Sequence, residues 1–166
     1  DETPSIIRKI AEMDARVSFH QNPYRKGYGA NYRTTFDLAT DITESDVDYF
    51  AWAAGHDRHH PQWLEKMIRT LDENLNAALA YPKTVRISET GERMDVPSPM
   101  FDTRGLSTNR RITAIRKKGT GFGNIIYGLF RADTLRRAGV FRSFLVPDTL
   151  LLWQLTLNGE IAQINE

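Results

Sequence analysis

Three of the four histidines in this 166-residue chain fall in one short segment, GHDRHHP. The segment follows YFAWAA (49–54), an uncharged run that suits a central strand covered on both faces. Ligands of open α/β sheets bind at the carboxyl ends of strands, so His56, Asp57, His59 and His60 are well placed for chemistry. Carboxylate suits Mg²⁺ and Mn²⁺, and imidazole suits later transition metals. The segment is therefore a candidate metal site, or alternatively a polar turn, since its spacing matches no zinc motif.

A second candidate is Asp148, which follows Pro147 and precedes the apolar run TLLLWQLTL. An Asp in this place is a natural N-cap, because its carboxylate can accept backbone N–H groups at the start of a helix. A carboxylate at the mouth of a cleft can also act as a general base toward a substrate hydroxyl. The residues alone favour the cap. The glycines of NPYRKGYG and KKGTGFGN lack the spacing of a phosphate-binding loop.

Alternating helix and strand patterns surround these candidates. Helical spacing predicts helices over 3–13, 31–39, 61–75, 133–139 and 148–159. Strands are predicted over 17–19, 49–54, 78–88 and 160–166. The alternation over residues 1–88 indicates an α/β fold with a mostly parallel sheet.

The region 89–123 has turn residues, two neighbouring prolines and the basic stretch RRITAIRKK, with no clear periodicity. It is predicted as loop and short strands. Long irregular segments in compact domains are usually functional or disordered, so we expect a mobile flap here.

The composition excludes several classes of protein. There are 22 Lys and Arg against 21 Asp and Glu, giving a formal charge of +1 with the basic residues spread along the chain, so dedicated nucleic-acid binding is disfavoured. Without cysteine, neither disulfides nor cysteine-metal sites can form. No apolar run approaches the ~20 residues that a transmembrane helix needs, and the N-terminus lacks a signal-peptide pattern. One cytoplasmic domain over 1–166 is expected.

Taken in order, the segments resemble family 2 glycosyltransferases, which have the GT-A fold. The matching segments are DETPSIIRKIAEMDARVSFHQNP, KGYGANYRTTFDLA, YFAWAAGHDRHHPQWLEKMIRTLDENLNAALAYP, IIYGLFRADTLRRAGVF and PDTLLLWQLTLNGEIAQI. The third is the strongest match, because the family has a strand, an acidic metal-binding motif and then P-x-x-L-E. The resemblance implies a nucleotide and metal side over 1–88 and an acceptor side over 89–166, with the flap at the acceptor site.

The resemblance also implies roles for single residues. Asp57 corresponds to the final acid of the D-x-D-type motif, which holds Mg or Mn on the donor diphosphate. Gly27 and Asn31 match the family's G-x-x-x-N segment on the donor side, and His56 stands where the family commonly has an acid, within reach of ribose or metal. Asp148 falls at the position of the catalytic base. The family's first strand, helix and second strand have no counterpart before Asp1, so a GT-A-like fold that is incomplete at its N-terminus is expected.

The resulting hypothesis is an inverting, metal-dependent glycosyltransferase. Its donor would be a nucleotide sugar and its acceptor a hydroxyl of a sugar, a lipid-linked sugar or a polysaccharide, with no nucleic-acid partner and no transmembrane segment. A peripheral position at a membrane stays open. Two alternatives also stay open: a catalytically silent sugar- or partner-binding domain of the same fold, and a nucleotidyltransferase, which shares the metal-diphosphate chemistry.

Overall fold

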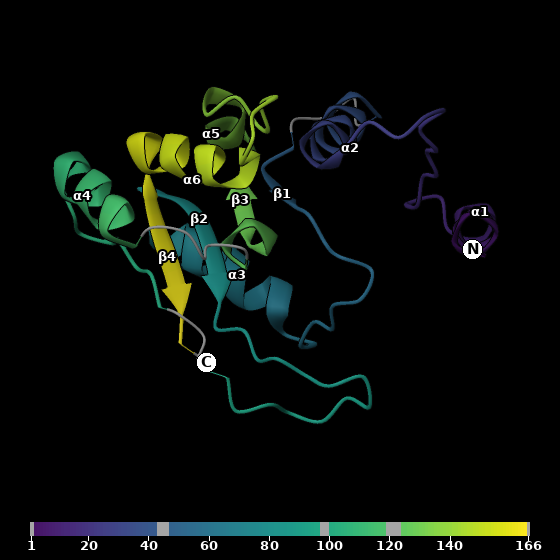
Figure 1. The fold of residues 1–166 in the computed structure, drawn as a ribbon, viewed down its shortest axis with the longest axis horizontal. Coiled ribbons are helices and arrows are strands. Elements are labelled where there is room, and N and C mark those ends of the chain that lie inside the picture. The colour runs from purple at the N-terminus through teal and green to yellow at the C-terminus, as the bar shows by residue number, and fades with distance from the viewer. Residues whose placement is uncertain (1, 43–46, 97–99, 119–123, 166) are drawn as a thin grey trace.

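The computed structural model describes residues 2–42, 47–96, 100–118 and 124–165, and a four-stranded sheet lies at its centre (Figure 1). The strands are β1 (Tyr49–Ala51), β2 (Ala77–Pro82), β3 (Leu129–Arg131) and β4 (Glu160–Ile164), in the order β1-β3-β2-β4. β2 and β4 pair in parallel, whereas β3 is antiparallel to both β1 and β2. Three strands run in one direction and β3 alone is reversed, so the sheet of this α/β fold is mixed, with one parallel and two antiparallel pairs of strands.

The helices are α1 (Thr3–Met13), α2 (Tyr28–Ile42), α3 (Trp63–Glu73), α4 (Thr108–Lys118), α5 (Ala132–Arg137) and α6 (Pro147–Asn158), with a short 3₁₀ helix, η1 (Ile125–Tyr127). Neighbouring residues of a strand point to opposite faces of the sheet, and the two faces have separate cores. On one face, Met67 and Leu71 of α3 belong to the cluster that contains Ala80 of β2. On the other, Leu151 and Leu155 of α6 belong to a second cluster, which also includes residues of α2, α4 and α5.

β1 is an edge strand of this sheet, so the prediction that YFAWAA forms a central strand is wrong. Its two faces do contact the two cores, although the face of Tyr49 and Ala51 is only partly covered. Phe50 and Trp52 are buried, whereas Tyr49 and Ala51 are only partly buried. The ring of Phe50 contacts Phe36 of α2, with the centroids 4.9 Å apart. The run lacks charge because its side chains pack against both cores, a requirement that edge and central strands share.

α1 lies apart from the sheet, and the irregular segment 14–27 connects it to α2 (Figure 1). No residue of α1 is buried, and its Ile6 and Ile10 are about half exposed. The segment 17–19, predicted as a strand, is irregular. Alternation of apolar and polar residues makes a strand only where a partner supplies hydrogen bonds, and within the described part of the chain none pairs with this segment.

The basic stretch of region 89–123 forms α4, which the sequence analysis missed. α4 packs against α6: Ile115 is buried, and Nε of Arg111 donates to the backbone oxygen of Thr156 at 2.8 Å. Ile112, Ala114 and Ile115 are too few among basic residues to give a clear helical period. The rest of the predicted flap includes 97–99 and 119–123, which lie outside the described residues. Within the described segments, no helix has the length and apolar character needed to cross a bilayer.

Candidate active site

Asp57 lies in a tight turn after β1, where its backbone N–H donates to the carbonyl of Ala54 at 3.0 Å. Its side chain is 39% exposed, and Oδ1 lies 3.7 Å from Nε2 of His56, whose side chain is almost fully exposed. The turn therefore presents one carboxylate and one imidazole to solvent.

The other two histidines of the segment make structural contacts near α3. The ring of His59 stacks on Trp63, with centroids 4.5 Å apart, and Nδ1 of His60 accepts the backbone N–H of Gln62 at 3.2 Å. Among the described residues, no three His, Asp or Glu side chains are grouped so that they could hold a metal ion. The structure favours the polar-turn interpretation for His59 and His60. Asp57 still fits Mg²⁺ or Mn²⁺, since such ions often bind through one or two carboxylates while substrate phosphates and water complete the shell.

Gly27 and Asn31 lie at the start of α2. Gly27 has a φ of 83°, a left-handed conformation that favours glycine, and its carbonyl accepts the N–H of Asn31 at 3.1 Å. The side chain of Asn31 accepts a hydrogen bond from Nδ2 of Asn22 at 3.0 Å. Gly27 thus shapes the entry to α2, and Asn31 is held on its first turn. Their donor-binding roles stay predictions.

Three tyrosines, Tyr28 and Tyr32 of α2 and Tyr127 of η1, lie together beside these residues. The hydroxyls of Tyr32 and Tyr127 are 2.9 Å apart, and the rings of Tyr28 and Tyr32 have centroids 4.5 Å apart. Burial raises the pKa of Tyr28 to about 12, and the charge of Asp148 contributes to the rise. Burial and the hydrogen bond with Tyr127 also raise the pKa of Tyr32. Both phenols therefore stay protonated at neutral pH.

Asp148 is the second residue of α6 and not its N-cap, so the capping prediction is wrong. Pro147 takes the first helical position, for which its fixed φ suits it, and this makes Val146 the N-cap. The starts of α2 and α6 lie together, since a Cβ added at Gly29 would be 3.2 Å from Pro147. Asp148 is partly buried, near enough to Tyr28 for its charge to affect the phenol.

We call Tyr28, Tyr32, Tyr127 and Asp148 the tyrosine–aspartate group. Of its four residues, only the aspartate is predicted from the sequence as a site residue. The available signal for the rest was the i, i+4 spacing of Tyr28 and Tyr32, which places them on one side of a helix. Nothing local connects them with Tyr127, which is 95 residues further along the chain.

The tyrosine–aspartate group lies at the carboxyl end of β1, which is also the end of the sheet where β3 begins. Ala51, the last residue of β1, pairs with Leu129, the first residue of β3, and Tyr127 is separated from β3 only by Gly128. Gly128 permits this approach, because a Cβ there would overlap the backbone oxygen of Ala80. The turn of Asp57 also follows the end of β1. The tyrosine–aspartate group and the turn of His56 and Asp57 thus both lie at the carboxyl end of β1.

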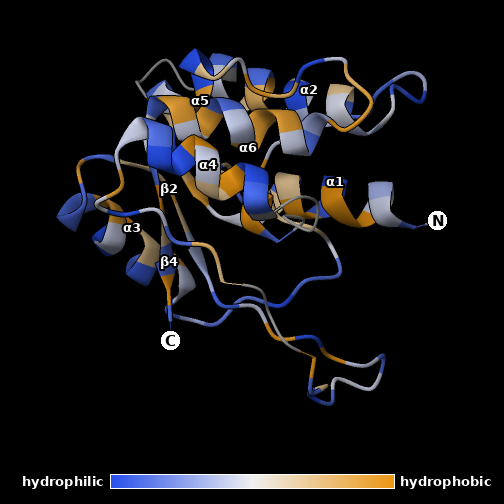
Figure 2. Ribbon diagram, turned by 60° about the vertical axis from the view of Figure 1, so that its left-hand side comes forward, coloured by the Kyte–Doolittle hydropathy of each residue, from blue (hydrophilic) through white to orange (hydrophobic). Residues whose placement is uncertain are grey.

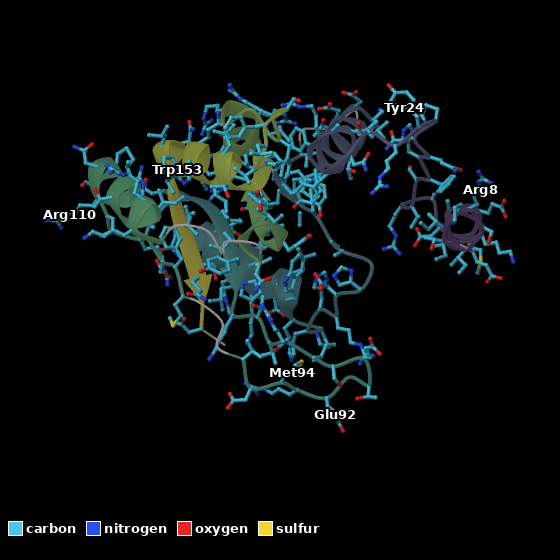
Figure 3. The ribbon with its side chains drawn as sticks, viewed as in Figure 1. Arg8, Tyr24, Glu92, Met94, Arg110 and Trp153 are labelled. Atoms are coloured by element: carbon cyan, nitrogen blue, oxygen red, sulfur yellow. The ribbon has the colours of Figure 1, made fainter. Side chains whose placement is uncertain are left out.

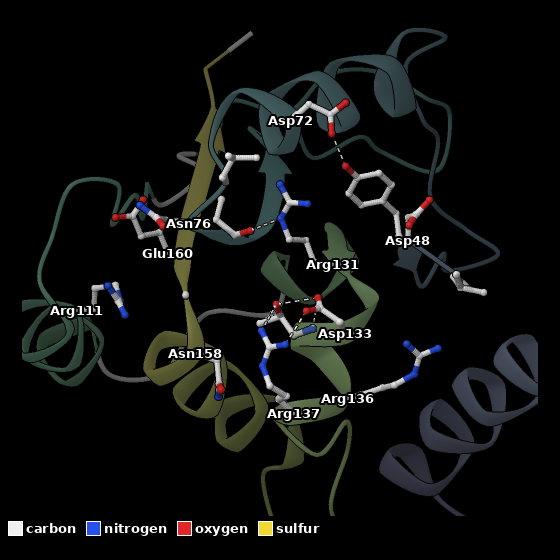
Figure 4. A pocket seen from close by; sticks show the side chains of 16 residues that line it. Asp48, Asp72, Asn76, Arg111, Arg131, Asp133, Arg136, Arg137, Asn158 and Glu160 are labelled. Carbon is white, nitrogen blue, oxygen red and sulfur yellow. Dashed lines mark hydrogen bonds and ion pairs between the residues drawn. The ribbon is translucent and has the colours of Figure 1, made fainter. Parts of the chain in front are cut away.

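A large cavity of 1190 Å³ opens at the opposite end of the strands, where β1, β2 and β4 begin (Figure 4). Its lining includes Tyr49, Ala77 and Glu160, which begin β1, β2 and β4. Arg131 donates to the backbone oxygens of Ala77 and Leu71, at 3.0 and 2.6 Å.

Other polar side chains that line this cavity are also paired. Arg137 binds Asp133 at 2.6 Å, and the hydroxyl of Tyr49 donates to Asp72. These contacts hold strand and helix ends together. None of the predicted site residues lines the cavity.

An α/β sheet with helices on both faces and polar groups at the carboxyl ends of its strands is the arrangement of many nucleotide-dependent transferases. The chain matches Glycosyl transferase family 2 over residues 1–138 and belongs to this family of glycosyltransferases, which has the GT-A fold. The match includes Gly27, Asn31, His56 and Asp57 but ends before Asp148. No curated protein matches the chain.

Proposed function

We propose that this protein is an inverting glycosyltransferase that uses a nucleotide sugar, with Asp148 as its catalytic base. The observation that carries the proposal is the position of Asp148 beside Tyr28, where the starts of α2 and α6 meet. A carboxylate is an adequate base for a sugar hydroxyl when it lies within hydrogen-bond reach. Membership of the family supports glycosyl transfer in general.

In the proposed reaction, the acceptor hydroxyl gives its proton to Asp148 while its oxygen bonds to the anomeric carbon of the donor. The bond from that carbon to the diphosphate breaks on the opposite side, so the configuration inverts and the nucleoside diphosphate leaves with the electron pair. The hydroxyl of Tyr28, which is near Asp148, can hydrogen-bond the acceptor. The hydroxyl of Tyr127, 2.9 Å from that of Tyr32, can do the same.

On the donor side we assign Asp57 to Mg²⁺ or Mn²⁺, and Gly27, Asn31 and His56 to the nucleotide sugar. A bound divalent ion would stabilise the negative charge that develops on the leaving diphosphate. The exposure of Asp57 supports this role, because it leaves room for phosphate and water ligands. In this proposal residues 1–88 serve the donor and 89–166 the acceptor, although Tyr28 and Tyr32 come from the first segment.

The test is release of nucleoside diphosphate from a panel of nucleotide sugars, with Mn²⁺ or Mg²⁺ and simple sugar acceptors. We expect release with one donor, and a product whose anomeric configuration, measured by NMR, is opposite to that of the donor. A product of retained configuration would contradict the assigned mechanism. Formation or consumption of pyrophosphate would indicate a nucleotidyltransferase.

The second candidate, a silent binding domain, is favoured by one observation: the turn after β1 offers a His56–Asp57 pair instead of two acids. Tight binding of a nucleoside diphosphate or a sugar without turnover across the whole panel would support it. The proposed transferase predicts turnover that depends on Asp148.

A further inference from the structure

α6 is apolar on both its inner and its outer side. Its inner side is buried against the sheet through Leu151, Leu152 and Leu155. Leu150, Trp153 and Leu157 follow Val146 at i+4, i+7 and i+11, and these four form one stripe on the outer side. On a surface helix the side that faces solvent usually carries charged and polar residues, and an apolar stripe there departs from this pattern. The outer stripe of α6 therefore calls for a covering partner.

The stripe is exposed in the structure. Val146 is 46%, Trp153 42% and Leu157 55% exposed, and Leu150 is partly exposed. It continues into the preceding loop, where Phe144 is 60% and Leu145 92% exposed. We call these six residues the outer α6 surface. Hydrophobic residues along α6 are visible in Figure 2. Contiguous apolar surface of this kind marks an interaction site more often than single exposed leucines do.

Positive charge is concentrated on α4, the helix that packs on α6. α4, which packs on α6, has the sequence TNRRITAIRKK with no acidic residue, and its Arg110, Arg116 and Lys117 are exposed. Figure 3 shows Arg110 pointing outward from α4, and Trp153 on the neighbouring α6. The chain as a whole has a formal charge of only +1, because acidic residues outside α4 offset its basic ones. α4 is therefore locally more positive than the chain as a whole.

The acidic groups of this layer lie on helices other than α4, and they include the exposed Asp37 and Asp41 of α2. Asp133 of α5 is paired with Arg137, and Asp148 is at the start of α6 beside the tyrosines. An apolar stripe that contains tryptophan and is flanked by Lys and Arg matches the chemistry of an anionic bilayer surface. Tryptophan prefers the headgroup level of a membrane, and basic side chains bind the acidic headgroups.

We propose that the outer α6 surface, together with the basic side chains of α4, docks this protein on membranes containing anionic lipid. The apolar side chains enter the headgroup region while Arg110, Arg116 and Lys117 contact lipid phosphates. A second copy of the chain is a poorer occupant, because self-association through α6 brings two basic α4 helices toward one interface. The inference goes beyond the proposed function and does not depend on catalysis.

The test is co-sedimentation of the chain with vesicles of phosphatidylcholine, alone or with about 30% phosphatidylglycerol. We expect at least tenfold stronger partitioning to the anionic vesicles, falling steeply as salt is raised. The double variant Trp153→Gln/Leu157→Gln and the triple variant Arg110→Gln/Arg116→Gln/Lys117→Gln should each lose about tenfold or more. Thermal unfolding checks that both variants fold.

Leu75→Gln and Arg69→Gln are matched controls. Arg69 is exposed on α3, and Leu75 is exposed two residues after the end of α3, which covers the opposite face of the sheet. They should bind vesicles like the wild type. Brominated lipid should also quench the fluorescence of the wild type more than that of Trp153→Phe.

Three outcomes would overturn the proposal. One is no sedimentation with anionic vesicles, and another is unchanged sedimentation of the folded α6 variant. The third is a concentration-dependent dimer that the α6 substitutions dissociate, in the absence of vesicle binding, which would assign the surface to a second copy.

Discussion

Substitutions of Asp148 should affect turnover and the stability of α6 to different extents. Asp148→Asn keeps the size of the side chain but cannot take a proton, so turnover should fall by roughly 10²- to 10⁴-fold. Since Val146 is the N-cap, neither Asn nor Ala removes a capping residue. The remaining stability cost is the loss of a negative charge in the first helical turn, about 0.3–1 kcal/mol. Diphosphate release and thermal unfolding measure the two effects, and full activity of folded Asp148→Asn would refute the base.

Substitutions of Asp57 and His56 should affect metal binding differently. If the Asp57 carboxylate holds the ion on the diphosphate, Asp57→Ala should abolish the gain in Mn²⁺ affinity that a nucleoside diphosphate provides. His56→Ala should leave most of that gain. Titration calorimetry with the nucleotide present measures it. Equal Mn²⁺ affinity of the wild type and Asp57→Ala would refute the assignment of Asp57. If the protein instead prefers zinc, and His56→Ala loses zinc binding, the imidazole of His56 is the metal ligand.

Among the elements, the contact between β2 and the start of β3 depends on Gly128. A Cβ at this position would overlap the backbone oxygen of Ala80, so Gly128→Ala must push β3 from β2 and displace Tyr127. We expect a loss of about 1–3 kcal/mol in the free energy of unfolding. Gly55→Ala is the matched control, because its Cβ would meet nothing within 4 Å. Denaturant unfolding measures both, and similar stability of the two variants would contradict the close approach.

α4 changes the expectation for region 89–123. Because α4 packs on α6 through Ile115 and Arg111, its backbone amides should exchange slowly with solvent. The segment 84–96 forms no helix or named strand, and its backbone hydrogen bonds are local ones around an isolated bridge between Ile87 and Arg93, so it should exchange more quickly. Hydrogen-exchange mass spectrometry compares the two. Fast exchange throughout α4 would restore the flap interpretation.

At the scale of the whole molecule, Asp102 links the loop before α4 to β4 and makes stability depend on pH. Its Oδ2 accepts the backbone N–H of Gln163 at 3.1 Å and lies 2.6 Å from Arg104. Burial alone would raise the pKa of Asp102, but the hydrogen bonds from Arg104 and Gln163 outweigh it and lower the pKa. The native state therefore favours the charged form. This contribution is complete above the unfolded pKa of about 4 and is lost as the pH falls through the lower folded value.

Asp102→Asn should consequently be less stable than wild type at pH 7, with a smaller loss of stability between pH 5 and 2. Urea unfolding at several pH values measures this slope. Glu92→Gln, in the exposed loop labelled in Figure 3, is the control and should keep the wild-type slope. An unchanged slope in Asp102→Asn would show that other groups carry the acid dependence.

The sequence by itself determined the features that depend on local patterns. The stripe of Trp63, Met67 and Leu71 predicted α3, and the apolar run after Asp148 predicted α6, each within a few residues of its observed bounds. The order of motifs indicated the family that the match over 1–138 confirms. Hydrophobic periodicity and motif order can be read without knowing which segments meet in space.

Only the tertiary structure decided which segments meet. β3 separates β1 from β2 and leaves β1 at the edge, and α4 gains its stability from packing on α6 although its own pattern is weak. Tyr32 and Tyr127 join across 95 residues. Such contacts follow from packing apolar faces over long separations, where many local patterns are compatible with several arrangements. For that reason the aspartate of the tyrosine–aspartate group could be singled out from the sequence as a candidate, and the tyrosines around it could not.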